Sequence, residues 1–217
     1  MSDLRVHFVR HGESVANACD RTGEPRPQDW DRLSERGWEQ ARGLGRRLEG
    51  HDLELIVSST MTRARETAEG IAEVLDLPVE EDADLHEYRQ SDAFYATMPP
   101  VADLGMLAWM PDAPRDHAEP GAESFDEAVA RVYRARERLE ERAGQRIVVV
   151  SHFNYLHFFL GVVLFGEAFG PEHLIPLHQA GHANTGITIF EKVARREMDG
   201  VDLPGWVLRT WNDRAHL

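Results

Sequence analysis

Three short apolar runs, far apart in the chain, constrain the fold more than any other feature of the sequence. They cover residues 4–9, 55–57 and 146–150, are rich in β-branched residues, and are bounded by residues that break regular structure. Strands that alternate with helices pair in parallel and carry the helices on their faces. The sequence therefore predicts an α/β fold in three layers, with a mainly parallel central sheet.

Helical patterns fill the intervals between these runs. The first helix is expected from an N-cap at Ser34 to Gly50, and the second over residues 62–75. A third begins at the capping box that starts with Ser124, and a fourth, almost wholly apolar, covers residues 155–165. Two more strands, at 186–192 and 206–211, are expected to pair antiparallel because the link between them is short. With no internal repeat, residues 1–217 are expected to form a single domain.

Composition narrows the class of protein. The 217 residues are 42% apolar, contain no run of 18 apolar residues and begin with a polar segment, so we expect a cytoplasmic protein without a membrane span. The single cysteine, Cys19, excludes an internal disulfide. A net charge of −14 disfavours nucleic acid and acidic membranes as partners. Any anion must therefore bind in a local basic pocket.

Polar residues follow each of the three predicted parallel strands. Arg10-His11-Gly12 follows the first, a hydroxyl-rich segment with Arg63 follows the second, and Ser151-His152 follows the third. Ligands of such sheets bind beyond the carboxyl ends of the strands, so these residues are expected to meet at one edge. An imidazole can attack phosphorus, and an arginine presents a planar fork to phosphate oxygens.

These segments, with several others in order, resemble the histidine phosphatase superfamily, which includes the phosphoglycerate mutases and many small phosphatases. The matching pieces are Arg10-His11-Gly12-Glu13-Ser14 with Asn17, Leu33-Ser34-Glu35-Arg36-Gly37 with Gln40-Ala41, Ser58-Ser59 through Arg63-Ala64 to Thr67-Ala68, Leu85-His86-Glu87, Gly121-Ala122-Glu123-Ser124, Val150-Ser151-His152 and Asn184-Thr185-Gly186-Ile187. Each piece is unspecific alone. Together they span nearly the whole chain in the family's order, and they imply a phosphoglycerate mutase-like fold.

The resemblance also implies roles for individual residues. His11 would be the nucleophile that becomes a phosphohistidine, and Arg10, Arg63 and His152 would form a cationic pocket around the transferred group. Asn17 would add a hydrogen bond to the phosphate. No metal or other cofactor is implied, because two arginines and an imidazolium can stabilise the charge.

Two further site residues are less firmly placed by the sequence. Glu87 is the candidate general acid, and the alternatives left open are nearby carboxylates, namely Glu80, Glu81, Asp82 and Asp84. Ser59 could contact the phosphate, although capping of the following helix is the favoured use of its hydroxyl. Phe153 stands where most relatives have glycine, and we expect its ring to pack under the fourth helix rather than against a substrate.

Residues 88–120 form an insert that is expected to act as a lid with an apolar underside. The insert is poor in cations, whereas phosphoglycerate mutases hold a second acidic group with several basic residues. The predicted function is therefore hydrolysis of a small phosphate monoester through phosphohistidine. A phosphoglycerate mutase and a non-catalytic module that binds a phosphate ligand are the alternatives. The sequence leaves the physiological ester open, and also whether the chain forms a homodimer.

Overall fold

The centre of the molecule is a mixed sheet of six strands. The computed structural model describes residues 4–91, 115–116, 118–193, 196–198, 201–203 and 205–217. In spatial order the strands are β3 (Val79–Glu81), β2 (Leu55–Ser58), β4 (Arg146–Ser151), β1 (Leu4–Arg10), β5 (Ile187–Lys192) and β8 (Trp206–Asp213). The first four pair in parallel, while β5 is antiparallel to both of its neighbours. The mainly parallel sheet and the antiparallel pair at its end are confirmed.

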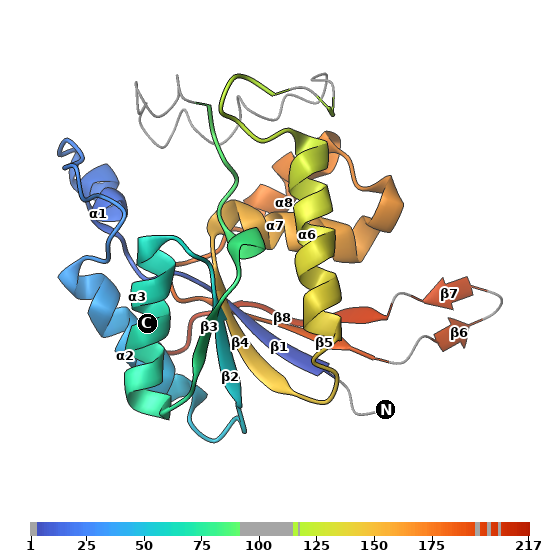
Figure 1. Cartoon of the computed structure of the whole chain (residues 1–217), viewed down its shortest axis with the longest axis horizontal. Coiled ribbons are helices and arrows are strands. Elements are labelled where there is room, and N and C mark those ends of the chain that lie inside the picture. The colour runs from blue at the N-terminus through green and yellow to red at the C-terminus, as the bar shows by residue number, and fades with distance from the viewer. Residues whose placement is uncertain (1–3, 92–114, 117, 194–195, 199–200, 204) are drawn as a thin grey trace.

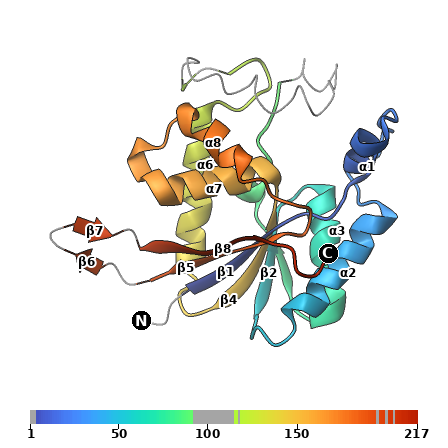
Figure 2. The ribbon, with the colours of Figure 1, turned by 180° about the vertical axis from the view of Figure 1, so that it is seen from behind.

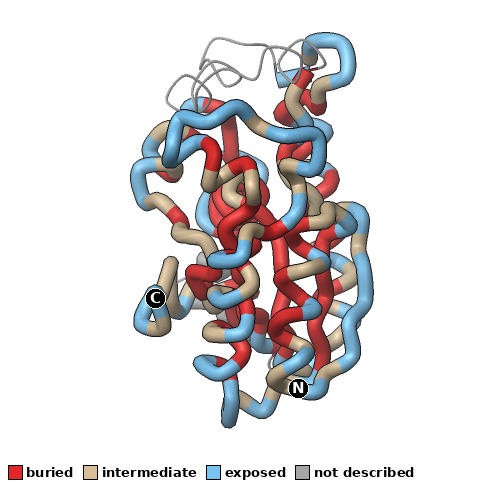
Figure 3. Tube along the Cα trace, turned by 90° about the vertical axis from the view of Figure 1, so that its left-hand side faces the viewer, coloured by how far each residue is buried: buried red, intermediate tan, exposed pale blue. Residues whose placement is uncertain are grey.

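Helices cover both faces of this sheet (Figures 1 and 2). On one face α2 (Glu35–Leu48) and α3 (Thr62–Leu75) pack on Val9 and alternate residues of the neighbouring strands. On the other face α6 (Phe125–Glu140) and α7 (Phe153–Phe165) pack on Phe8. Successive strand side chains point to opposite faces, so each strand contributes to both cores. The three-layer arrangement is confirmed, and the buried strands run through its middle (Figure 3).

Several short elements are additions to the predicted set. They are the edge strand β3, α1 (Val15–Thr22), α8 (Leu174–Gln179), the 3₁₀ turns η1 (Ala83–Leu85), η3 (Gly166–Ala168) and η4 (Pro171–His173), and a hairpin of β6 (Arg196–Met198) and β7 (Val201–Leu203). The hairpin projects from the β5 and β8 end of the sheet (Figure 1). No helix in the described ranges is both long and apolar enough to cross a membrane. The predicted lid falls mostly on residues 92–114 and 117, outside the described residues.

Glycine at position 37 permits a close backbone contact between α2 and the loop after β1. A Cβ atom on Gly37 would collide with the carbonyl oxygen of Glu13, whose backbone cannot move aside without displacing the loop. By contrast, a Cβ on Gly43 in the same helix would meet only Arg46 Nη2, at 3.8 Å. The loop between β1 and α1 is therefore held against α2 by a contact that only glycine allows.

Alanine at these two positions should have opposite effects on stability. Gly37→Ala is expected to lower the free energy of unfolding by about 1–3 kcal/mol or more, because the added methyl group forces two backbone segments apart. Gly43→Ala is expected to raise it by about 0.5–1 kcal/mol, because alanine favours a helix. Urea unfolding of both variants checks this, and equal effects would contradict the close-contact explanation.

Candidate active site

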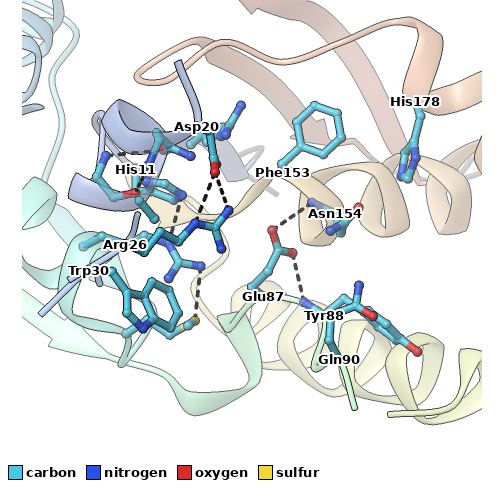
Figure 4. Close-up of a pocket in the computed structure, with 16 residues that line it drawn as sticks. His11, Asp20, Arg26, Trp30, Glu87, Tyr88, Gln90, Phe153, Asn154 and His178 are labelled. Carbon is cyan, nitrogen blue, oxygen red and sulfur yellow. Dashed lines mark hydrogen bonds and ion pairs between the residues drawn. The ribbon is translucent and has the colours of Figure 1, made fainter. Parts of the chain in front are cut away.

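A cavity opens at the carboxyl ends of the parallel strands, between α1 and the start of α7 (Figure 4). Its volume is about 330 Å³. It is lined by Arg10, His11, Ser14, Ala16, Asn17, Asp20, Arg26, Trp30, Met61, Arg63, Glu87, Tyr88, Gln90, Phe153, Asn154 and His178. Five of the seven predicted site residues therefore border one cavity. The other two, Ser59 and His152, are fully buried and are absent from its lining.

His11 lies at the end of β1 and is almost fully buried, with 3% of its surface exposed. Its Nδ1 lies 2.7 Å from the carbonyl oxygen of Gly12, which can only accept a hydrogen bond. The proton of the neutral ring is thereby placed on Nδ1, and the lone pair on Nε2. Arg63 Nε–H donates to this Nε2 at 3.0 Å. The nitrogen with the free electron pair thus faces a guanidinium.

The surroundings of His11 keep its imidazole neutral. Burial lowers the pKa of His11 well below 6.5, and the positive charges of Arg63 and then Arg10 lower it further. The hydrogen bond to Gly12 opposes this shift in part. An uncharged imidazole is the form that can attack phosphorus, so the arginines that would bind the phosphate also keep the nucleophile active.

Arg63 is positioned by a residue that the sequence did not single out. The Arg63 guanidinium forms an ion pair with Asp31, whose other oxygen accepts a hydrogen bond from Thr62 N at 3.0 Å. α3 has no side-chain cap from its own N-cap residue, Met61, so Asp31 supplies one from a distant loop. No periodic pattern marks Asp31, because its position depends on how that loop packs on α3.

Arg10, which is half-buried, contributes the second cation of the site. Its Nη1 donates to the carbonyl oxygen of His182 at 2.7 Å, and its guanidinium lies 5.2 Å from the centre of the Phe153 ring. Burial lowers the pKa of Arg10 to about 10, which leaves it charged at neutral pH. Its Nε is buried and has no hydrogen-bond partner within the described residues.

The loop after β1 is anchored from three sides. Gly12 N donates to Thr67 Oγ1 of α3 at 2.9 Å, and Asn184 Nδ2 donates to the carbonyl oxygen of His11 at 2.9 Å. Asn17 forms the capping box of α1 with Ser14 and accepts a second hydrogen bond from Asn184. The oxygen of Asn17 is thus used within the protein, while its side chain still borders the cavity.

His152 and Ser59 form a pair beneath the cavity. His152 Nε2 lies 2.8 Å from Ser59 Oγ, and the rings of His152 and His11 are 5.3 Å apart between centroids. Burial, and then the charge of Arg63, lower the pKa of His152 well below 6.5, so the surroundings oppose the predicted cationic form of His152, which stays a prediction. The preferred role of Ser59 as a helix cap is corrected, since its hydroxyl contacts His152 and Met61 N.

Glu87 borders the cavity from the segment that follows η1. Its Oε1 accepts hydrogen bonds from Tyr88 N at 2.9 Å and Tyr155 N at 3.2 Å, and its Oε2 accepts one from Asn154 N at 3.3 Å. The neighbouring carboxylates Asp82 and Asp84 instead pair with arginines of α6. Glu80, Glu81, Asp82 and Asp84 do not line the cavity, so Glu87 is the carboxylate of this group that does.

The ring of Phe153 lines the cavity, which corrects the expectation that it packs away from the site. It lies between the Arg10 guanidinium and the rings of His157 and His178. The reason is local, because α7 begins at Phe153 itself and its first side chain lies among the residues that line the cavity (Figure 4). Asp20, Arg26 and Trp30 also line the cavity, although the sequence did not mark them as site residues.

Comparisons with known proteins place this geometry in a family. The sequence matches the histidine phosphatase superfamily (branch 1) over residues 6–213. It is 28% identical over 222 residues to a protein of Salmonella choleraesuis named probable phosphoglycerate mutase GpmB, covering 99% of this chain and 95% of the relative.

Solved structures give the same result. A putative alpha-ribazole-5'-P phosphatase of Escherichia coli is 27% identical, with a TM-score of 0.71 and coverage of 98% of this chain and 97% of that one. A mycobacterial glucosyl-3-phosphoglycerate phosphatase is 25% identical, with a TM-score of 0.70 and coverage of 98% and 100%. Because the family match runs from β1 to β8, the chain belongs to the histidine phosphatase superfamily, branch 1.

Proposed function

We propose that the protein is a metal-independent phosphomonoesterase that works through a phosphohistidine at His11. The observation that carries this proposal is the state of His11, whose tautomer is fixed by Gly12 and whose Nε2 faces Arg63 in the cavity. Phosphoryl transfer leaves most of the rate to positioning and to charge stabilisation of the phosphate oxygens. Arg10 and Arg63, which both line the cavity, supply that charge.

The reaction consists of two displacements at phosphorus. In the first, His11 Nε2 attacks, the bond from phosphorus to the ester oxygen breaks, and protonated Glu87 gives its proton to the departing alkoxide. In the second, water attacks phosphorus, the bond to Nε2 breaks, and the Glu87 carboxylate takes a proton from the water. Inorganic phosphate leaves, and both side chains return to their starting forms. This is general acid and base catalysis by one carboxyl group.

Independence from metals is supported by the residues of the site. The charge of the phosphate is matched by two buried or half-buried guanidinium groups, and these need no metal bridge. Over the described part of the chain, no cluster of three or more His, Cys, Asp or Glu residues is arranged to hold a metal ion. The chemistry of the donors therefore favours direct recognition of phosphate by arginine.

The charges of the cavity favour hydrolysis over the mutase alternative that the GpmB relative raises. A mutase of phosphoglycerate must bind a second acidic group of the substrate. The third arginine of the cavity, Arg26, is paired with Asp20 at 2.6 Å, and residues 92–114 contain no lysine, arginine or histidine. We therefore expect the preferred substrate to be a monoester whose alcohol part carries no second negative charge.

A panel of phosphate monoesters, assayed for phosphate release in EDTA, tests this proposal. The expected result is undiminished hydrolysis in the chelator, with higher kcat/KM for uncharged alcohols than for 3-phosphoglycerate. Loss of activity in EDTA that is restored by a divalent metal would contradict metal independence. Isomerisation of 3-phosphoglycerate without phosphate release would establish the mutase, and binding of inorganic phosphate without any turnover would establish the binding module.

A further inference from the structure

The segment that carries Glu87 has no regular secondary structure of its own, and side chains of neighbouring elements hold the backbone before it, among them Ser151, whose hydroxyl donates to the carbonyl oxygen of Leu85 at 2.6 Å. Arg131 of α6 donates from Nη1 to the carbonyl oxygens of Asp84, at 2.8 Å, and His86, at 2.7 Å. These carbonyls lie on the chain directly before Glu87. Rotation of Arg131 would therefore remove this donor from both carbonyls and loosen the backbone from which the Glu87 side chain extends.

Arg131 is itself held by a buried, two-pronged ion pair with Glu123. Arg131 Nε lies 2.7 Å from Glu123 Oε1, and Nη2 lies 2.8 Å from Oε2. The two side chains are only 8% and 7% exposed. Such pairs contribute little net stability, since desolvation offsets the attraction. Their geometry is nevertheless strongly directional, because the guanidinium fork matches the carboxylate plane.

Glu123 also holds the chain on the other side of Glu87. Its backbone N donates to the carbonyl oxygen of Arg89 at 2.9 Å, and its carbonyl oxygen accepts a hydrogen bond from the Tyr88 hydroxyl. The Arg131 guanidinium also lies 5.6 Å from the centre of the Tyr155 ring, and Tyr155 N donates to Glu87 Oε1. Arg131 and Glu123 together thus contact the residues before and after Glu87, and a residue that binds its carboxylate, Arg131 through its side chain and Glu123 through its backbone.

We propose that the Arg131–Glu123 ion pair is a positioning device that aims Glu87 at the leaving-group oxygen. Neither residue of the pair lines the cavity, so their effect on the reaction passes through Glu87. This proposal rests on the proposed function and on the role of Glu87 as general acid. A displacement of about 1 Å in a catalytic group can cost about 100-fold in rate, which sets the scale of the effect.

The dependence of kcat/KM on the leaving group separates positioning from general structural damage. The value of kcat/KM reports the steps up to departure of the alcohol. An alkyl alcohol leaves as a strongly basic alkoxide that needs a proton from Glu87, whereas p-nitrophenolate is stable enough to leave without one. Arg131→Lys is expected to lower kcat/KM for glycerol 2-phosphate by about 10- to 100-fold. For p-nitrophenyl phosphate the expected decrease is below about 5-fold, because acid catalysis adds little there. Glu123→Gln, which keeps the shape of the side chain, should give the same difference, with a large loss for glycerol 2-phosphate and a small one for p-nitrophenyl phosphate.

A double-mutant cycle makes the test independent of folding defects. Glu87→Gln should show the same difference between the two esters, with a larger loss of kcat/KM for glycerol 2-phosphate. Adding Arg131→Lys to Glu87→Gln should cause little further loss, because the carboxyl group being positioned is already gone. Arg134→Lys is the matched control, since Arg134 lies three residues after Arg131 on α6, is itself exposed, and pairs with the side chain of Asp84 rather than with a backbone carbonyl. It should leave both kcat/KM values unchanged.

Two results would overturn the positioning role. One is an equal decrease for the two esters in Arg131→Lys and Glu123→Gln, and the other is a full additional loss on top of Glu87→Gln. Suppose that Glu87→Gln lowers kcat/KM equally for the two esters while His11→Ala is inactive. Glu87 is then not the general acid, and the proposal fails although the phosphohistidine mechanism stands. Activity in His11→Ala would instead reject the proposed function.

Discussion

Replacement of His11 by alanine is expected to abolish phosphate release, lowering kcat by at least about 10⁴-fold, because the covalent step loses its nucleophile. Among the residues that the structure describes, no other side chain is placed to act as this nucleophile. The ring of His152 lies 5.3 Å from that of His11, but His152 is fully buried and does not border the cavity. Glu87 borders the cavity, but its oxygens are held by three backbone N–H groups.

The measurement is steady-state phosphate release from the best ester of the panel. His51→Ala is the matched control, because His51 contacts His7 and does not line the cavity. The control should keep the activity of the original protein. Turnover by His11→Ala at more than about one hundredth of the original rate would contradict the mechanism, since loss of an acting nucleophile costs far more than that.

Arg63→Met should have the second largest effect, a decrease in kcat/KM of about 10²- to 10³-fold, which is the size expected when one donor to the transition state is removed. Arg63 is in direct contact with His11 Nε2 and is buried, so its charge acts on the transferred group with little screening by water. Arg65→Met is the control, because Arg65 lies on the same helix but is exposed and pairs weakly with Glu81, at 3.9 Å.

The pH dependence of kcat/KM adds a second readout for Arg63. Burial is the main cause of the lowered pKa of His11, and the charge of Arg63 is the next. In the original protein His11 should therefore remain neutral, and active, well below pH 6.5. Removing the positive charge raises the pKa of His11, so in Arg63→Met the acidic decline should begin at higher pH. If the decline of kcat/KM at acidic pH were unchanged in Arg63→Met, or shifted to lower pH, the proposed effect of the Arg63 charge on the pKa of His11 would be contradicted.

The sequence predicted those parts of the fold that have a periodic pattern. The apolar strands and the amphipathic helices α2, α3 and α6 were predicted because one face of each is buried, and burial imposes a regular spacing of apolar residues. Ser34 and Ser124 were recognised as caps for a local reason, since their hydroxyls bind N–H groups three residues ahead. Short elements such as α1 and β3 escaped prediction because they span too few residues to show a period.

The site was predicted where it coincides with the ends of strands. His11 and His152 directly follow β1 and β4, so the rule for parallel sheets places them together. Asp31, Asp20, Arg26 and Trp30 lie in or beside loops whose path is fixed by tertiary packing. The lowered pKa of His152 could not be predicted from the sequence either, because burial of an imidazole depends on neighbours that are distant in sequence. Tertiary contacts, and not local pattern, set these features.

Rapid acid-free quenching of the protein during turnover of an aryl phosphate, followed by peptide mass spectrometry, tests the central claim most directly. The account predicts a phosphoryl group on the His11 peptide that is stable in alkali and labile in acid, and that is absent from His11→Ala. Glu87→Gln should increase its amount, because release of the phosphoryl group to water loses its base. A phosphoryl group on any other residue, or turnover without a phosphorylated intermediate in both proteins, would contradict the account.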